Sequence, residues 1–305
     1  MGLITFDLDD TLFPIGPVVQ DANIAMFESM AKFGYEDATE EGYLLACKDI
    51  RKERYQPGCL NPITYSELRK QGIQKELERC RRERTQGTKT LDDTKDQSYD
   101  DEYIVKKSFE AWLNERQASA ERHLFENTKE MFEQLKSDFP NACIAAVTNG
   151  RGNPMYMPSI QEYFDFCVSG EDDDVFPNRK PNKEIFESTL SKASSILAKK
   201  NDQFSESESL TSFHYWIHVG DDLANDVGAS AACGAKAIWM CVKEEEMGKP
   251  NDGKPAVKGK TFFTSTASKE EQIAREKLAR DAYASVSAKI SSLAELPDAI
   301  RSVLD

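Results

Sequence analysis

The sequence predicts an α/β fold in which a parallel sheet is flanked by helices and interrupted by an inserted α-helical domain. After residue 125, short apolar runs alternate with stretches of helical periodicity. Between residues 14 and 125, apolar residues recur at helical spacing and strand signals are scarce. We therefore expect a core formed by residues 1–13 and 126–305, with a helical domain at 14–125 inserted after the first strand.

Composition restricts the class of protein. Of the 305 residues, 39% are hydrophobic and 10% aromatic, which is typical of a globular chain. The net charge of −14 disfavours binding to nucleic acid. Seven cysteines without a Cys-x-x-Cys pair indicate neither a disulfide framework nor a zinc site, and they suit a reducing compartment.

Location follows from the apolar runs. None reaches membrane-spanning length, and a strand that begins at residue 3 leaves no space for a signal peptide. We therefore expect a soluble intracellular protein in the cytoplasm, with no membrane partner. The oligomeric state cannot be predicted from these features.

The first strand is predicted at residues 3–6, an apolar run that ends in the carboxylates of Asp7, Asp9 and Asp10. A buried strand that ends in carboxylates is costly unless a cation compensates for them. The alternative is an acidic turn whose aspartates are solvated or cap a helix.

The inserted domain is predicted to contain about four helices, with breaks near Gly34, Pro57 and Gly87. Within it, residues 69–84 are rich in lysine and arginine, and residues 92–102 are acidic. These stretches suit either a basic surface that grasps a substrate or a solvated helix followed by an acidic loop.

The remaining elements alternate as a parallel α/β sheet requires. We expect strands at 143–147, 164–168, 215–219, 235–242 and 289–293, helices at 126–139, 182–197, 270–287 and 297–304, and loops at 201–209 and 243–260.

Polar residues follow several of these strands. Ligands bind at the carboxyl edge of an open α/β sheet, so these side chains are expected to converge there. A set rich in carboxylates predicts a hard divalent cation, usually Mg²⁺, which binds beside a substrate phosphate. The residues expected at this edge are Asp7, Asp9, Thr148, Lys180, Asp221, Asp222 and Asp226.

Four segments carry a family resemblance. They are Asp7-Leu8-Asp9-Asp10-Thr11, Thr148-Asn149-Gly150, Lys180-Pro181, and Gly220-Asp221-Asp222 followed by Asn225-Asp226. Through these segments and their order, the chain resembles the haloacid dehalogenase (HAD) superfamily. The resemblance is to the phosphatase branch with an inserted helical cap of the C1 type. The resemblance implies a Rossmann-like core, and it extends hardly at all to the cap.

The resemblance also implies roles for individual residues. Asp7 would be the nucleophile that forms an aspartyl-phosphate, and Asp9 the general acid and base. Thr148, Asn149, Gly150 and Lys180 would bind the phosphoryl group. Mg²⁺ would be held by Asp7, the Asp9 main-chain carbonyl, Asp221 and Asp222, while Asp226 would orient these ligands.

Alternatives remain for two of these positions. Lys183 could take the role of Lys180, and Asp222 could be a helix N-cap instead of a ligand. His218 has no assigned role and is expected to be structural.

The function expected from the resemblance is Mg²⁺-dependent hydrolysis of a small phosphomonoester such as a sugar phosphate or nucleotide. A phosphomutase or phosphotransferase would need the same motifs. A 2-haloacid dehalogenase ranks lower, since such enzymes typically lack an aspartate at the position of Asp9. A non-catalytic interaction protein ranks last because the motif set is complete.

Overall fold

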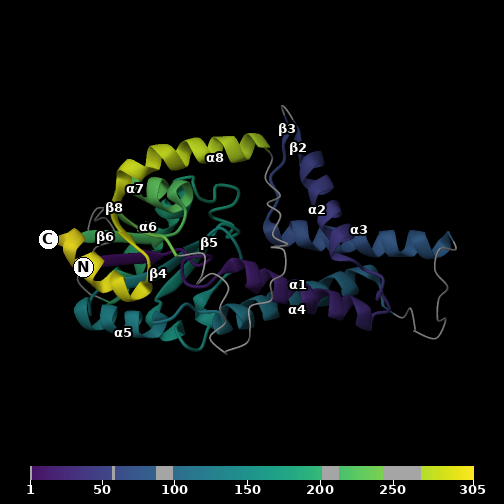
Figure 1. Cartoon of the computed structure of the whole chain (residues 1–305), viewed down its shortest axis with the longest axis horizontal. Helices are drawn as coiled ribbons and strands as arrows, with labels where there is room; N and C mark the ends of the chain where they lie inside the picture. Colours follow the sequence, from purple (N-terminus) through teal and green to yellow (C-terminus); the bar gives the residue numbers. More distant parts are fainter. Residues whose placement is uncertain (1, 57–58, 87–98, 201–212, 243–268) are drawn as a thin grey trace. The chain divides into compact units, whose positions relative to one another are not determined.

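The computed structural model describes residues 2–56, 59–86, 99–200, 213–242 and 269–305 (Figure 1). The described chain separates into two compact units, each with its own hydrophobic core. One unit contains the residues up to Ile15 and those from Ala120 onward, and the other consists of Gly16–Ser119. The loops expected at 201–209 and 243–260 lie outside the described residues, as does most of the acidic stretch at 92–102.

The first unit is built on a six-stranded parallel sheet with the strand order β5-β4-β1-β6-β7-β8. β1 and β4 are buried along their whole length, as expected for parallel strands covered on both faces. β1 lies between β4 and β6, so the chain builds outward from it in two directions. The strands are β1 (Gly2–Phe6), β4 (Cys143–Thr148), β5 (Phe166–Ser169), β6 (Tyr215–Gly220), β7 (Lys236–Met240) and β8 (Val286–Ile290).

Helices cover both faces of this sheet, with α5 and α9 on one side and α7 and α8 on the other in Figure 1. Successive side chains of β1 point to opposite faces of the sheet. Phe6 packs on Phe132 of α5, with ring centroids 5.1 Å apart, while Leu3 joins the cluster that contains Phe186 of α6. The helices are α5 (Thr128–Asp138), α6 (Glu184–Lys200), α7 (Ala229–Ala232), α8 (Lys269–Ala282) and α9 (Leu296–Leu304), and the short helical turns are η1 (Pro154–Tyr156), η2 (Gln161–Tyr163), η3 (Leu223–Gly228), η4 (Tyr283–Ser285) and η5 (Leu293–Glu295).

The C-terminal elements differ from the sequence-based expectation. The helix expected at 270–287 ends at Ala282, and the strand expected at 289–293 is β8, which begins at Val286. The sequence of β8 contains serine, alanine and lysine, which give no apolar run. Pairing with β7 determines its conformation, because tertiary contacts override local strand propensity.

The second unit contains the four expected helices, together with a two-stranded ribbon that the sequence did not predict. Its core includes Met26, Tyr43, Leu77 and Trp112. The helices are α1 (Ile15–Lys32), α2 (Glu40–Arg54), α3 (Tyr65–Thr85) and α4 (Asp101–Arg122), and the strands are β2 (Tyr55–Gln56) and β3 (Cys59–Leu60).

The basic stretch at 69–84 lies within α3 and is partly tied into the second unit. Arg69 stacks over the Trp112 ring at 3.8 Å, and Arg84 pairs with Asp37. These contacts give part of the basic stretch a structural role in its own unit. In the described part of the chain, no helix combines the length and apolar character needed to cross a bilayer.

We predict that Phe132→Ala destabilises the sheet unit, because Phe132 is fully buried among Phe6, Tyr163 and Phe164. Loss of the ring should lower the free energy of unfolding by about 3–5 kcal/mol, measured by urea denaturation. Leu278→Ala removes a half-exposed side chain from α8 and should change it by no more than about 0.5 kcal/mol. Equal effects of the two substitutions would contradict this description of the core.

Candidate functional site

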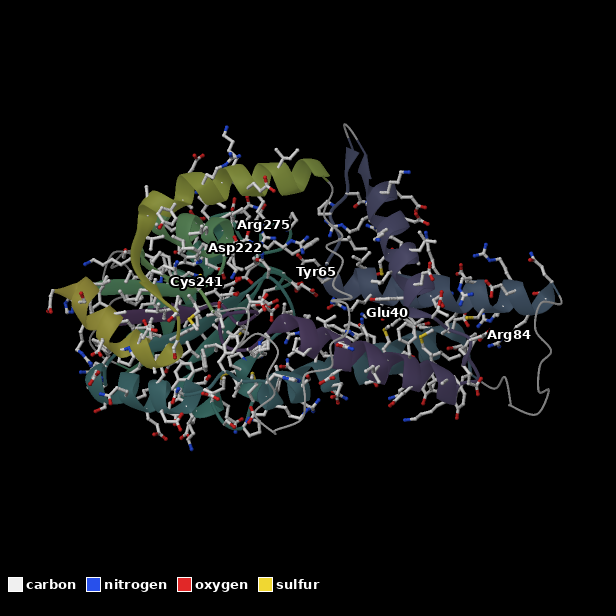
Figure 2. The ribbon with its side chains drawn as sticks, in the orientation of Figure 1. Glu40, Tyr65, Arg84, Asp222, Cys241 and Arg275 are labelled. Atoms are coloured by element: carbon white, nitrogen blue, oxygen red, sulfur yellow. The ribbon has the colours of Figure 1, made fainter. Side chains whose placement is uncertain are left out.

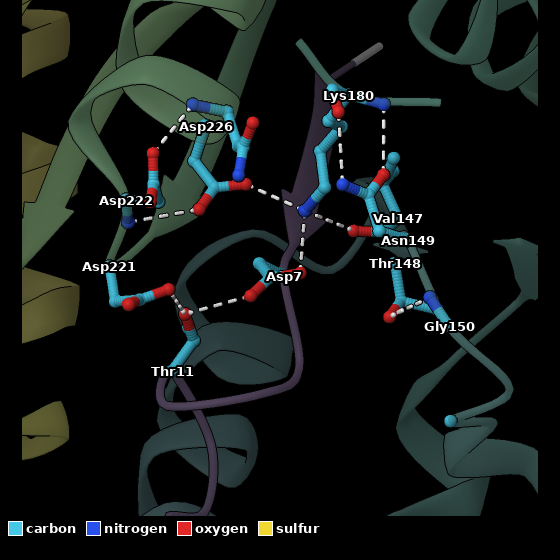
Figure 3. Close-up of polar contacts among 12 residues, drawn as sticks. Asp7, Thr11, Val147, Thr148, Asn149, Gly150, Lys180, Asp221, Asp222 and Asp226 are labelled. Atoms are coloured by element: carbon cyan, nitrogen blue, oxygen red, sulfur yellow. Dashed lines mark hydrogen bonds and ion pairs between the residues drawn. The ribbon is translucent and has the colours of Figure 1, made fainter. Parts of the chain in front are cut away.

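The turn after β1 carries the first site residue. Asp7 is buried at the end of β1, where Figure 3 shows its carboxylate between Thr11 and Lys180. Its backbone N–H donates to the Val219 carbonyl at 2.8 Å. Asp10 has a left-handed backbone (φ 60°), which directs the chain away from the strand. Its carboxylate accepts from the backbone N–H of Ile15 at 2.9 Å, at the start of α1. Asp10 therefore caps the helix, while Asp7 is held at the sheet edge.

The ammonium of Lys180 joins three parts of this edge. Its Nζ donates to Asp7 Oδ1 at 2.5 Å, to Asp226 Oδ1 at 2.6 Å and to the Val147 carbonyl at 2.9 Å. Lys180 is only 4% exposed, so these three bonds satisfy all of its donors in a buried setting. Asn149 holds the lysine backbone from both ends, accepting from its N–H at 2.8 Å and donating to its carbonyl at 3.0 Å.

Asp226 lies behind the ammonium with both carboxylate oxygens engaged. Oδ1 also lies 3.4 Å from His218 Nε2, and Oδ2 accepts from the Asp222 backbone N–H at 3.0 Å. A Cβ atom at Gly220 would lie 2.4 Å from the Asp226 Cβ, so only glycine permits this approach. The arrangement leaves Asp226 to position Lys180.

Three carboxylates form an acidic cluster at this point. One oxygen from each of Asp7, Asp221 and Asp226 lies within 4.8 Å of the others. The Thr11 hydroxyl lies 3.4 Å from Asp7 Oδ2 and 3.5 Å from Asp221 Oδ1. One ammonium cannot balance three ionised carboxylates, and oxygen donors suit a hard divalent cation. Since the oxygens of Asp226 are engaged, Asp7 and Asp221 are the two carboxylates that fit such an ion.

Burial and mutual repulsion shape the ionisation of the cluster. Burial raises the pKa of Asp7 to about 8, although Lys180 favours its ionised form. Burial and the neighbouring carboxylates also raise the pKa of Asp221. For Asp226, burial is outweighed by Lys180 and His218, which lower its pKa to about 2. Burial disfavours the Lys180 ammonium, but the two carboxylates that it contacts outweigh this and raise its pKa.

The turn after β4 forms the other side of the site. Thr148 is 1% exposed, and its Oγ1 accepts from the Gly150 backbone N–H at 3.3 Å. A Cβ atom at Gly150 would lie 3.9 Å from Asp9 Oδ2. The Asp9 carboxylate therefore lies beside the turn formed by Thr148, Asn149 and Gly150.

The structure distinguishes between the two lysines considered from the sequence. Lys180 lies in the acidic cluster, whereas Lys183 is exposed and pairs with Glu187 at 2.8 Å. Thr11 belongs to the first motif, but the sequence assigned it no role. The sequence feature that could have indicated a contact with Asp7 was the position of Thr11 four residues later, in the turn that follows β1.

Asp222 is a helix cap in the structure and not a member of the acidic cluster. Its Oδ1 accepts from the backbone N–H groups of Ala224 and Asn225 at 2.9 and 2.8 Å, and its Oδ2 pairs with Arg275. We therefore assign Asp222 as an N-cap in place of the metal ligand suggested by the resemblance. Arg275 had no sequence signal, because only the fold brings α8 to this turn.

Comparisons with known proteins identify the family of the chain. A family model described as haloacid dehalogenase-like hydrolase matches residues 1–234, which end before β7. A comparison with curated proteins gave no significant match.

Solved structures with a similar fold were also found. A 2-haloacid dehalogenase from Pseudomonas syringae pv. Tomato DC3000 is 21% identical, with 99% of each chain covered and a TM-score of 0.58. A putative β-phosphoglucomutase from Thermotoga maritima is 16% identical (99% of this chain and 100% of that chain covered, TM-score 0.45), and a HAD phosphatase from Thermococcus onnurineus is 16% identical (98% of each, 0.43). The fold of the Pseudomonas syringae enzyme is similar to that of this chain.

We predict that the Asp7 carboxyl lowers the free energy of unfolding more strongly as the pH rises. Because its pKa rises from 3.8 to about 8 on folding, the folded protein binds more protons than the unfolded chain between these values. The free energy of unfolding therefore falls as pH rises through this window. Asp7→Asn should gain stability relative to wild type from pH 4 to pH 8, measured by urea unfolding in EDTA. The exposed Asp173→Asn control should show a constant difference, and a constant difference for Asp7→Asn would contradict the prediction.

We also predict that Lys180→Met is strongly destabilising, since it leaves Asp7 and Asp226 without their buried cation. The expected loss is about 3–5 kcal/mol, measured by urea unfolding at pH 7. Lys183→Met removes an exposed ammonium and should leave the urea midpoint nearly unchanged. A small effect of Lys180→Met would show that the ion pairs do not support the fold.

Proposed function

Because the chain belongs to the haloacid dehalogenase-like hydrolase family, we propose that it is a Mg²⁺-dependent phosphatase that acts on a small phosphomonoester. The observation that carries the proposal is the buried carboxylate of Asp7, held by Lys180 at 2.5 Å and beside the carboxylate of Asp221. These contacts fix the orientation of the Asp7 carboxylate, so that it is not free to rotate into solvent. Such a group suits nucleophilic attack on phosphorus.

In the first half-reaction, an oxygen of Asp7 attacks phosphorus and the bond from phosphorus to the leaving oxygen breaks. This step forms an aspartyl-phosphate and releases an alcohol. Asp9 donates a proton to the leaving oxygen. Its position beside Gly150, in the turn proposed to bind the phosphoryl group, supports this role.

In the second half-reaction, water attacks phosphorus and the bond to the Asp7 oxygen breaks, which releases inorganic phosphate and restores the carboxylate. Asp9 accepts the proton from this water. One residue thus serves as the acid and then as the base.

The remaining residues bind and balance charge. Lys180 offsets the charge on Asp7 and on the transferring group, and Asp226 keeps the ammonium in place. The Thr148 hydroxyl and the Asn149 backbone N–H bind phosphoryl oxygens, and the Gly150 N–H orients that hydroxyl by donating to its oxygen. A divalent cation held by Asp7, Asp221 and the Asp9 main-chain carbonyl would supply further positive charge beside the phosphoryl group.

The substrate class follows from the family resemblance and is a small phosphorylated metabolite, such as a sugar phosphate or nucleotide. A phosphomutase would differ in passing the phosphoryl group from Asp7 to a second hydroxyl instead of water. A dehalogenase would release halide, which leaves without a proton, so Asp9 would have no acid role. An interaction protein would turn over none of these substrates.

The test is hydrolysis of p-nitrophenyl phosphate in Mg²⁺ and in EDTA. Asp7→Asn should abolish turnover because it removes the nucleophile. Asp9→Asn should lower kcat about 10²- to 10⁴-fold, the usual contribution of a general acid or base. The exposed Asp173→Asn control should retain wild-type activity.

Each outcome assigns a function. No turnover by wild-type protein in Mg²⁺ would reject the phosphatase, and full activity of Asp7→Asn would reject its mechanism. Halide release from 2-chloropropionate that survives Asp9→Asn would identify a dehalogenase. Phosphoryl transfer to an added sugar phosphate, at the expense of free phosphate, would identify a mutase.

A further inference from the structure

The peptide unit that joins Asp221 to Asp222 is held at both polar ends. The Asp221 carbonyl accepts from the indole Nε1 of Trp239 at 2.7 Å, and the Asp222 N–H donates to Asp226 Oδ2 at 3.0 Å. Rotation of this peptide plane would turn the Asp221 carboxylate away from Asp7. The two hydrogen bonds oppose that rotation.

Trp239 is itself fixed by elements that follow it in the chain. It lies on β7 beside Gly220 of β6. Gly220 immediately precedes Asp221 in the chain. On β8, its neighbour Lys289 places its ammonium 4.4 Å from the Trp239 ring centroid. The Tyr283 ring meets the indole edge-on, with centroids 6.0 Å apart. The indole N–H is therefore presented at a defined position.

A second attachment comes from α8. Its Arg275 pairs with Asp222 Oδ2, while Asp222 Oδ1 caps η3, and the two labelled side chains lie side by side in Figure 2. α8 also packs closely on η3, because a Cβ atom at Gly228 would lie only 2.7 Å from the Ala282 Cβ. The turn is thus held from β7 on one side and from α8 on the other.

We propose that Trp239 and Arg275 are positioning residues, which hold the Asp221–Asp222 peptide so that the Asp221 carboxylate faces Asp7 and the pair is ready for a divalent cation. Both residues lie beyond residues 1–234, so the part of the chain matched by the family model does not contain these two contacts. The inference rests on the proposed function, since it assigns Asp221 to the metal.

The test compares variants that remove positioning without changing charge. Trp239→Phe keeps the ring between Lys289 and Tyr283 but loses the N–H. Arg275→Lys keeps the positive charge but loses the planar fork that matches a carboxylate. Arg280→Lys is the control, because Arg280 is on the same helix and donates to the Glu276 carbonyl at an exposed position.

The first readout is the dissociation constant for Mg²⁺, measured by calorimetry on the full chain without substrate. Trp239→Phe should weaken binding about tenfold, as expected for a group that orients a metal ligand. Arg275→Lys should weaken it about threefold, since its partly exposed pair is weaker. The Mg²⁺ concentration for half-maximal phosphatase activity should rise in parallel, while kcat at saturating Mg²⁺ changes less. Arg280→Lys should match wild type in every measurement.

Melting curves separate positioning from folding. If Trp239→Phe does not melt cooperatively, Arg275→Lys carries the test. Wild-type Mg²⁺ affinity in the folded variants, or an equal loss in Arg280→Lys, would overturn the inference while leaving the phosphatase intact. A wild-type protein that binds no Mg²⁺ would overturn the proposed function, and this inference with it.

Discussion

The buried ion pairs of Lys180 with Asp7 and Asp226 are the interaction on which the rest of the sheet edge depends. They link the ends of β1 and β6, and the bond to the Val147 carbonyl adds β4. The Lys180 ammonium and the Asp226 carboxylate stabilise each other at this depth, and removing either one would leave a buried charge without its partner. The contacts that close the sheet edge are therefore the same contacts that fix the Asp7 carboxylate, the proposed nucleophile.

The acidic cluster also lowers the stability of the fold, and a functional role would explain why it is present. One ammonium faces three carboxylates, and burial raises the pKa values of Asp7 and Asp221. Such a surplus of negative charge does not help a protein to fold. It suits the proposed divalent-cation site, and perturbed carboxylates of this kind cluster at functional sites.

Much of this arrangement could be predicted from the sequence. The apolar runs that became β1 and β4 are buried on both faces, so their pattern is clear, and the order of the four motifs indicated which strand ends carry Asp7, Thr148 and Asp221. Other features depend on contacts between distant residues. An N-cap and a ligand look alike in sequence, so Asp222 stayed ambiguous until its Oδ1 was seen to accept two backbone N–H groups. β8 lacks an apolar run and is defined by pairing with β7.

The position of β1 in the sheet has a consequence for biosynthesis. Leu3 pairs with Cys143 and Gly2 with Tyr215, so β1 is translated long before either of its neighbouring strands. Until then both edges of this apolar strand lack their native hydrogen-bond partners, a state that favours pairing with other chains. Non-local pairing of this kind also slows folding. The nascent chain must therefore shield the very segment that carries Asp7, and an intervening helical unit that folds early, or a chaperone, would limit aggregation in that interval.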